Sequence, residues 1–454
     1  MALVIAGTFV ISSVASRPIG VTITDEVRYL TEAQAIAKHM ALKEAASYLP
    51  SEGTPQPIYP IGWPFVLAPT TSLGEWAPFS LPILIHLIGA ALFATVLQRR
   101  GLSAWWALLY FAQPAQLLFS RTLMAETIAS LWTVALILAA DRGSPGGVGF
   151  LAASSAMLKP SLAMATVPFA LAWVIFEIPK SERLQAFVRT ALGALVPIAC
   201  WIWLKHAGLT GTAGYRLYAT ATPSLRHVGL VLLTFLFAWP LLPLGAWRAR
   251  PSERVGAAAL LAVLIFYQYD YVGPSWAATL VVGSRLQLPA IVMLLPGYAI
   301  ILASTATRFR SAMLAALVAT GLTLPLTLMR TLATRRRVLD GVATATLAAL
   351  RPGCLVGYTP FAVKLLVPYP HSISLYSVAE EQKLQAALLA GDCVDLIAPI
   401  AQLTTLEGDF SDPGFFKGLL HEFSHCALDV PGAARIIRVA QTTISCGSSE
   451  PDLK

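Results

Sequence analysis

Long apolar runs separated by short polar segments repeat along about the first 330 residues. A helix needs about 20 residues to cross roughly 30 Å of hydrocarbon. Windows of about that length fall at residues 1–16, 77–97, 103–119, 122–140, 146–158, 161–178, 186–204, 228–247, 255–270, 287–304 and 311–329. The pattern predicts a polytopic α-helical membrane protein with about eleven transmembrane helices, several of them short.

The first window has a second interpretation, because Ser13-Val14-Ala15 resembles the cleavage site of a signal peptide. A signal peptide also carries a basic segment before its apolar core, and this chain has none there. We therefore favour a retained first helix.

Composition supports the membrane interpretation, since 56% of the residues are hydrophobic and only 12% are charged. Soluble domains have about 45 to 50% apolar and about 25% charged residues. The net charge of +8 does not indicate nucleic-acid binding, because the basic residues form short clusters between apolar runs, where topology signals occur.

Lys and Arg collect in alternate loops, which predicts the orientation of the chain. The clusters assigned to the cytoplasm are Arg99-Arg100, Arg142, Lys180 with Arg183 and Arg189, Arg248 to Arg254, and Arg308 with Arg310. The N-terminus is then cytoplasmic, the long first loop (17–76) is extracytoplasmic, and the membrane is a cell (inner) membrane. Arg330 and Arg335 to Arg337 break the rule, but long trailing domains translocate largely regardless of charge. A miscounted span is the alternative explanation.

The character of the chain changes after Leu350. Residues 355–358, 394–397 and 436–439 read as short buried strands, and residues 378–389 as a helix. We expect a transmembrane domain over 1–335 and a small α/β extracytoplasmic domain over 336–454. This region contains four cysteines, Cys354, Cys393, Cys426 and Cys446, which can pair in three ways. Disulfides among them would fit an oxidising compartment.

Four local patterns share the predicted outer side of the membrane. The acidic pair Asp25-Glu26 opens a predicted surface helix over residues 25–48 in the first loop. The other patterns are Tyr59-Pro60-Ile61-Gly62-Trp63-Pro64, then Ser120 to Glu126 together with Leu158-Lys159-Pro160-Ser161, and finally Ser284-Arg285-Leu286-Gln287-Leu288-Pro289.

The order of these patterns along the chain, and their common side of the membrane, are similar to those in the GT-C superfamily of glycosyltransferases. These enzymes use polyprenyl-phosphate sugars, as do the protein O-mannosyltransferases and the lipid A aminoarabinose transferase. The resemblance covers about residues 1–330, and Leu286 replaces an aromatic residue that is usual in the family. It implies a GT-C-like fold and a glycosyltransferase that moves a sugar from a polyprenyl-phosphate donor to an extracytoplasmic acceptor, which is a protein, a lipid or a glycan.

The resemblance also implies roles for individual residues. A sugar on a lipid phosphate carries its own leaving group, so the enzyme needs a base for the acceptor hydroxyl and cations for the released phosphate. Asp25 is the expected base and Glu26 its alternative. Arg285, Lys159 and Arg121 are the candidate phosphate ligands, and Glu126 and Tyr59 further substrate contacts. No metal or other cofactor is expected, and attack opposite the phosphate inverts the anomeric centre.

Each role has a structural alternative. Asp25 can be a solvated acid at a helix start, Glu26 a partner of Arg28, and Arg285 a snorkelling side chain at a span boundary. Tyr59 and Trp63 fit interface anchors better than substrate contacts.

Two other functions compete with a transferase. His421-Glu422-Phe423-Ser424-His425 matches the zinc-protease pattern, which requires both imidazoles on one helix face. The absence of an evident third ligand and the nearby Pro431 favour a solvated helix instead. A membrane transporter or flippase is the other alternative, although no inverted repeat is evident.

Overall fold

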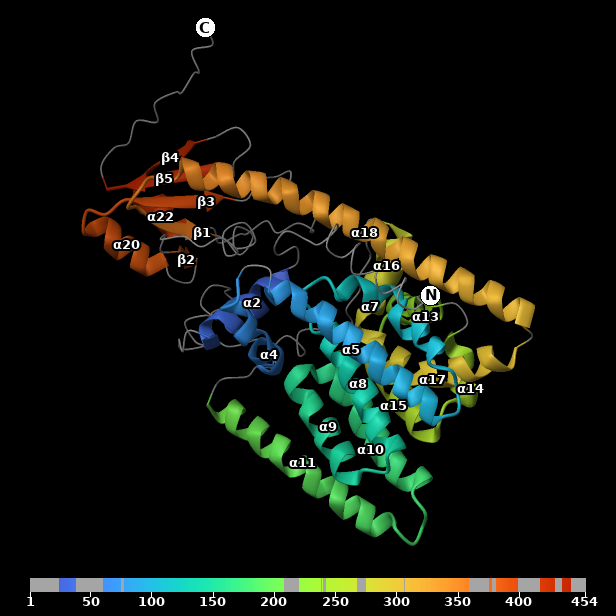
Figure 1. Ribbon diagram of the computed structural model, residues 1–454. Helices are drawn as coiled ribbons and strands as arrows, with labels where there is room; N and C mark the ends of the chain where they lie inside the picture. The colour runs from blue at the N-terminus through green and yellow to red at the C-terminus, as the bar shows by residue number, and fades with distance from the viewer. Residues whose placement is uncertain are drawn as a thin grey trace. The chain divides into compact units, whose positions relative to one another are not determined.

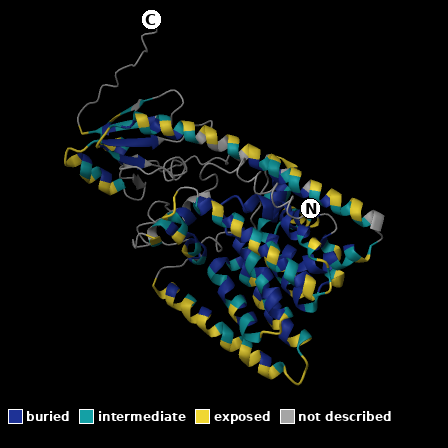
Figure 2. Ribbon diagram, in the orientation of Figure 1, coloured by how far each residue is buried: buried dark blue, intermediate teal, exposed yellow. Residues whose placement is uncertain are grey.

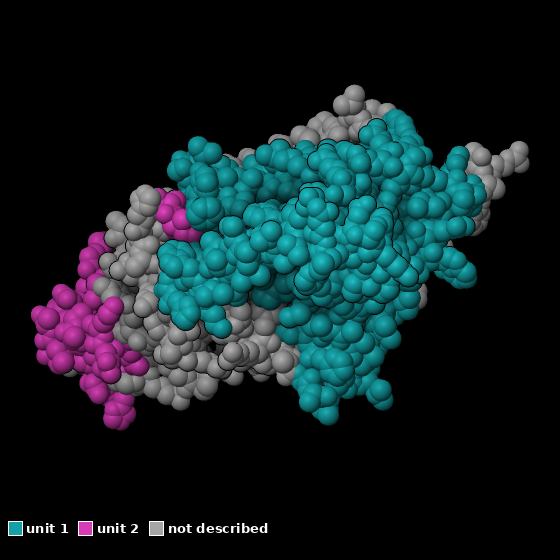
Figure 3. All heavy atoms as spheres, turned by 90° about the horizontal axis from the view of Figure 1, so that it is seen from below, with its two compact units in different colours: residues 1–18, 57–332 teal, residues 19–56, 333–454 magenta. Residues whose placement is uncertain are grey.

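The computed structural model describes most of the chain in two compact units (Figure 3). The first unit comprises residues 1–18 and 57–332, and the second comprises residues 19–56 and 333–454. The described residues are 24–37, 60–74, 77–207, 220–237, 239, 242–267, 275–305, 307–358, 375–377, 381–398, 417–428 and 435–441. The predicted first span, Tyr59 and Cys446 lie outside them. The predicted domain boundary at residue 335 falls inside one helix, α18 (Thr307–Ala349). The division into two domains stays a prediction.

The first unit is a bundle of apolar helices (Figure 1). Its longer helices are α5 (Ala77–Arg99), α8 (Glu126–Asp141), α9 (Pro145–Leu158), α10 (Pro160–Ala172), α11 (Arg183–His206), α13 (Leu225–Phe237), α15 (Pro251–Ile265) and α17 (Leu288–Ser304). The most enclosed is α17, which contacts α8, α14 (Gly245–Arg248) and α15. Within the described residues, five segments are long and apolar enough to span a membrane: Ala77–Arg99, Pro160–Glu177, Arg183–His206, Ala278–Ser304 and Arg310–Thr331.

Helix α11 shows what surrounds the bundle. It packs on α9, yet large apolar side chains along it are exposed, including Leu184, Phe187, Leu192 and Val196 (Figure 2). Such a row of exposed apolar residues is unfavourable in water and favourable in lipid. The predicted polytopic helical membrane fold is therefore confirmed.

Two predicted spans are wrong as continuous helices. Residues 103–119 form three short pieces, η1 (Ala104–Ala107), α6 (Leu108–Phe111) and α7 (Pro114–Phe119). The break precedes Pro114, and the Gln113 side chain caps α7 by accepting from the amide of Gln116. In the window 228–247, α13 ends at Phe237 and the chain continues through η3 (Leu242–Leu244) into α14. The predicted number of spans is accordingly not established.

Charged side chains at one end of the bundle connect loops that the sequence analysis predicts on the cytoplasmic side. Arg100 contacts both Asp141 and Glu253, and Arg250 lies 2.8 Å from Asp141 and 3.6 Å from Glu177. Burial raises the pKa of the Glu253 carboxyl despite the adjacent Arg100 guanidinium. The ends of α5, α8 and η2 (Trp173–Glu177) and the start of α15 therefore meet. Which side of the membrane they face stays a prediction.

The second unit contains α2 (Thr24–Ala37) and a small five-stranded sheet of order β2-β1-β3-β5-β4. The strands are β1 (Leu355–Tyr358), β2 (Leu375–Ser377), β3 (Val394–Ala398), β4 (Ser424–Leu428) and β5 (Arg435–Ala440). The strand pairs β1–β2 and β1–β3 are parallel, whereas β3–β5 and β4–β5 are antiparallel. Helices α20 (Glu381–Leu389) and α22 (Lys417–Glu422) supply Leu384, Leu388 and Leu419 to its core. The three predicted strands and the helix are confirmed, while β2 and β4 were not predicted.

The zinc-protease pattern does not lie on one helix. Helix α22 ends at Glu422 and β4 begins at Ser424, so His421 and His425 lie on different elements. Among the described residues, no group of three or more His, Cys, Asp or Glu side chains is placed to bind a metal. The metalloprotease alternative is therefore wrong, and the solvated-helix interpretation holds for the exposed His421 and Glu422 but not for Ser424 and His425, which lie on β4.

A disulfide joins Cys354, just before β1, to Cys393, just before β3. Cys426 is also disulfide-bonded, and Cys200 on α11 is a free, exposed cysteine. Disulfides within the C-terminal region are thus confirmed.

Replacing Cys393 with serine should destabilise the second unit. The bond closes a loop of 39 residues, for which the chain-entropy estimate is about 4 kcal/mol. Thermal unfolding in detergent measures the effect, and Cys200→Ser is the matched control that should unfold like the wild type. Equal stability of both variants would contradict this prediction.

Candidate active site

Two of the four sequence patterns meet at the end of the bundle opposite the Arg100 network. Helix α8 runs from Glu126 to Asp141, which lies in that network, so Glu126 marks the other end, about 22 Å away. Helix α9 returns to Lys159, and α4 (Gly62–Thr71) packs against both α5 and α9. The patterns around Gly62, Glu126 and Lys159 therefore share one region.

Trp63 connects two of these patterns directly. Its side chain is fully buried, and the indole nitrogen donates a hydrogen bond of 2.6 Å to the carbonyl of Leu123. The predicted role of Trp63 as an interface anchor is wrong, because an anchor keeps its polar edge at the water interface. The residue instead holds α4 against the turn that precedes α8.

Gly62 lies where the backbones of α4 and α9 come closest. A β-carbon at this position would collide with the carbonyl oxygen of Met157, which belongs to the backbone and cannot rotate away. Glycine is therefore required for α4 to begin beside Lys159.

We expect Gly62→Ala to destabilise the protein by about 1 to 3 kcal/mol, as overpacked sites do. Gly229→Ala is the control, because a β-carbon on this exposed helical glycine meets open space. Thermal unfolding in detergent compares the two variants. A Gly62→Ala protein as stable as Gly229→Ala would contradict the close approach.

Lys159 and Glu126, which the sequence predicts as two separate site residues, form a buried ion pair. The ammonium nitrogen of Lys159 lies 2.7 Å from Oε1 of Glu126, and the side chains are 8% and 2% exposed. Oε2 of Glu126 has no hydrogen-bond partner within the described part of the chain. Burying a charge is unfavourable unless an opposite charge lies beside it, so the two side chains stabilise each other at this position.

Arg121 adds a second buried cation to this end of the bundle. It lies in the turn between α7 and α8, is 3% exposed, and directs Nη1 toward the sulfur of Met329, 2.6 Å away. Burial lowers the pKa of Arg121 to about 10, so the guanidinium remains charged at neutral pH. A buried positive charge at this position is suited to an anionic ligand.

Arg285 lies at the same end of the bundle. It occupies the short helix η4 (Ser284–Gln287), which leads into α17 and contacts α15, and Gln287 and Leu264 from these two helices line one pocket. The preceding helix, α16 (Trp276–Gly283), packs on α7, which ends just before Arg121. Arg285 is half-buried, whereas Lys159 and Arg121 are buried.

Asp25 and Glu26 occupy the first turn of α2 in the second unit. Glu26 is fully buried, and Tyr29, Leu30 and Ala33, which follow it at helical spacing, are also buried. The side chain of Asp25 lies outside the described side chains, and the roles of both acids stay predictions. The predicted helix over 25–48 is described as far as Ala37.

Sequence reasoning missed the residues that line a small pocket beside Arg285, namely His227, Thr234 and Gln287. Gln287 lies within the pattern Ser284 to Pro289, in which only the charged Arg285 was a predicted site residue. A polar side chain inside an apolar run, as His227 and Thr234 are, was the available signal.

The fold belongs to a known class, the GT-C-like polytopic membrane fold with a small C-terminal sheet region. Two crystal structures of ArnT from Cupriavidus metallidurans share it. The structure bound to undecaprenyl phosphate matches with a TM-score of 0.60 and 12% identity over 97% of this chain and 98% of that chain. The apo structure matches with a TM-score of 0.59 and 13% identity over 96% and 97%. No family model and no curated protein sequence matches the chain.

Proposed function

We propose that this protein is a membrane glycosyltransferase that moves a sugar from a polyprenyl-phosphate donor to an acceptor on the extracytoplasmic face. The observation that carries the proposal is the fold shared along nearly the whole chain with ArnT, one structure of which holds undecaprenyl phosphate. Cations at one end of the bundle support it, because Arg121, Lys159 and Arg285 are the groups that a lipid phosphate requires.

The proposed reaction is a single displacement at the anomeric carbon. Asp25 takes the proton of the acceptor hydroxyl, whose oxygen bonds to the anomeric carbon as the bond from that carbon to the phosphate oxygen breaks. The electron pair leaves with the phosphate, and attack from the opposite face inverts the centre. Protein cations rather than a metal stabilise the departing charge.

The ion pair with Glu126 gives Lys159 a definite place in this scheme. Glu126 fixes the ammonium group at 2.7 Å and compensates its charge while the site is empty of donor. An incoming phosphate supplies further negative charge to the same ammonium. Glu126 thus acts as a positioning residue for Lys159, and Glu26 supports Asp25 or substitutes for it as the base.

A transfer assay with purified protein in membranes tests the proposal. The donors are undecaprenyl-phosphate sugars labelled in the sugar, and the acceptor fraction is the extracytoplasmic protein, lipid and glycan of a bacterial envelope. We expect label to move from the donor to a component of that fraction. Movement of intact donor across the membrane without transfer would favour a flippase and overturn the proposal.

Arg285→Ala should weaken the use of the lipid donor more than the use of the acceptor. The guanidinium is proposed to bind the phosphate, and losing a charge-assisted hydrogen bond costs about 1.5 to 3 kcal/mol, or about 10- to 150-fold. The measurement is the KM for each substrate with the other saturating. A variant whose acceptor KM rises while its donor KM is unchanged would exclude the phosphate role, and Arg254→Ala at the opposite end serves as the control.

A further inference from the structure

Arg285 lies on a short helix whose own hydrogen bonds do little to fix it. The residues of η4 form a 3-10 helix, a type with poorer hydrogen-bond geometry than an α-helix that rarely extends beyond one turn. The backbone bond at its end runs from the amide of Leu288 to the carbonyl of Arg285. The position of the Arg285 guanidinium therefore depends on contacts between η4 and other helices.

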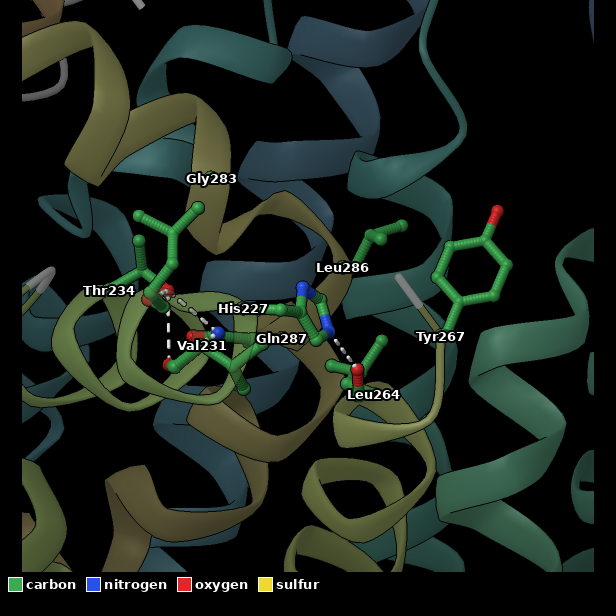
Figure 4. Close-up of a pocket in the computed structure, with 9 residues that line it drawn as sticks. His227, Val231, Thr234, Leu264, Tyr267, Gly283, Leu286 and Gln287 are labelled. Carbon is green, nitrogen blue, oxygen red and sulfur yellow. Dashed lines mark hydrogen bonds between the residues drawn. The ribbon is translucent and has the colours of Figure 1, made fainter. Parts of the chain in front are cut away.

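Gln287, the last residue of η4, makes such a contact with α13 (Figure 4). Its amide nitrogen donates to the carbonyl of Val231 at 2.9 Å and to Oγ1 of Thr234 at 2.8 Å. A backbone carbonyl only accepts, so this contact determines which end of the amide is nitrogen. Gln287 and Thr234 are both buried. One side chain thus joins η4 to a single turn of α13.

Thr234 contacts the chain at both ends of η4. Its hydroxyl lies 2.9 Å from the carbonyl of Leu230 in its own helix, so the hydrogen is used within α13 and the oxygen accepts from Gln287. Gly283 immediately precedes η4, and a β-carbon there would come within 2.9 Å of Cγ2 of Thr234. The close approach at Gly283 and the hydrogen bond at Gln287 together fix η4 against α13.

The pocket beside this contact is too small to hold part of the substrate. Thr234, Gln287 and Leu286 are among its lining residues, and its volume of about 20 Å³ is room for about one water molecule. Oε1 of Gln287 has no hydrogen-bond partner among the described residues, and leaving a buried acceptor unpaired is unfavourable. An apolar side chain would avoid that cost, so the amide contributes the direction of its two hydrogen bonds.

We propose that Gln287 and Thr234 are positioning residues for Arg285, which they hold where its guanidinium binds the phosphate of the lipid-linked donor. The inference rests on the proposed function, because Arg285 is the proposed phosphate ligand. Gln287 follows Arg285 by two residues, so a shift of η4 away from α13 moves the guanidinium with it. A displacement of about 1 Å at a site can cost about 100-fold in rate, which makes a fixed η4 valuable.

The test is a double-mutant cycle between Gln287 and Arg285, with undecaprenyl phosphate as the probe. Native mass spectrometry or calorimetry of the full chain in detergent measures its affinity. Gln287→Met keeps the length of the side chain and removes both hydrogen bonds, so it should lower the affinity about 10-fold. In the Arg285→Ala background the same substitution should change the affinity less than about 2-fold, because a residue that acts through the guanidinium has no effect without it.

Variants of Thr234 test the contact from the other side. Thr234→Val removes one of the two acceptors of the Gln287 amide and should lower the affinity about 3-fold, whereas Thr234→Ser keeps the hydroxyl and should bind like the wild type. Thr133→Val is the matched control, because the Thr133 hydroxyl makes the same kind of bond within its own helix, 2.9 Å from the carbonyl of Ala129 in α8. It should keep the wild-type affinity, and thermal unfolding verifies that each variant is folded.

The outcomes separate this inference from the proposed function. If Gln287→Met lowers the affinity equally with and without the Arg285 side chain, the glutamine acts independently of the guanidinium and the inference is overturned. Wild-type affinity in both Gln287→Met and Thr234→Val would also overturn it, while the lipid-binding proposal stands. If the wild type does not bind undecaprenyl phosphate, or Arg285→Ala binds it as tightly as the wild type, the phosphate role in the proposed function itself fails.

Discussion

Replacing Asp25 with asparagine should reduce sugar transfer by about 100- to 10,000-fold, the range that a general base contributes. Asparagine has nearly the same shape, but its amide cannot take the proton of the acceptor hydroxyl. Donor binding should be unchanged, because the lipid phosphate contacts the cations and not this carboxylate. The measurement is transfer rate together with affinity for undecaprenyl phosphate.

Two further variants make the Asp25 result specific. Asp392→Asn, on an exposed loop of the second unit, removes a carboxylate elsewhere and should leave transfer unchanged. Glu26→Gln distinguishes the two acids, because it removes the buried carboxylate of Glu26 and leaves Asp25 in place. Normal transfer by Asp25→Asn with loss in Glu26→Gln would move the base to Glu26, and normal transfer in both would remove the proposed mechanism.

Breaking the ion pair between Glu126 and Lys159 should have the largest effect on stability. Glu126→Gln leaves the Lys159 ammonium without its compensating charge, and removing one partner of a buried pair costs about 3 to 5 kcal/mol. Lys159→Met should cost a similar amount by leaving the Glu126 carboxylate buried. Thermal unfolding in detergent measures both, with Lys205→Met on the exposed end of α11 as the control.

The double variant Glu126→Gln with Lys159→Met completes the cycle. It leaves no uncompensated charge, so it should be more stable than the sum of the single effects predicts. It should nevertheless bind undecaprenyl phosphate weakly, because the proposed phosphate ligand is gone. Additive stability effects would show that the two residues do not act as a pair.

Apolar run length was a good guide to the helices that face lipid and a poor guide to interrupted segments. Residues 77–97 and 186–204 correspond closely to α5 and α11, since a lipid-facing helix must be apolar for its whole length. Residues 103–119 are equally apolar but enclosed by protein, where irregular backbone is tolerated. Hydropathy does not distinguish these cases, although Pro114 marked the break.

The sequence predicted which residues belong to the candidate site better than how they interact. It identified Lys159 and Glu126 because ionisable groups near membrane depth are costly and therefore require a reason. It did not pair them, because they are 33 residues apart, with Glu126 at the start of α8 and Lys159 between α9 and α10. The prediction that Trp63 is an interface anchor was wrong for the same reason, since its hydrogen-bond partner Leu123 lies 60 residues away.

The sequence by itself determined that this is a polytopic membrane protein with a disulfide-containing α/β region near its C-terminus. Both conclusions rest on local properties, namely run length, charge clusters, strand patterns and cysteine positions. Only the tertiary structure decided that Gly62, Trp63, Glu126 and Lys159 meet at one end of the bundle and that Gln287 faces a pocket. Those facts depend on contacts between distant segments, which the packing of α4, α8 and α9, and of α13 with η4, brings about.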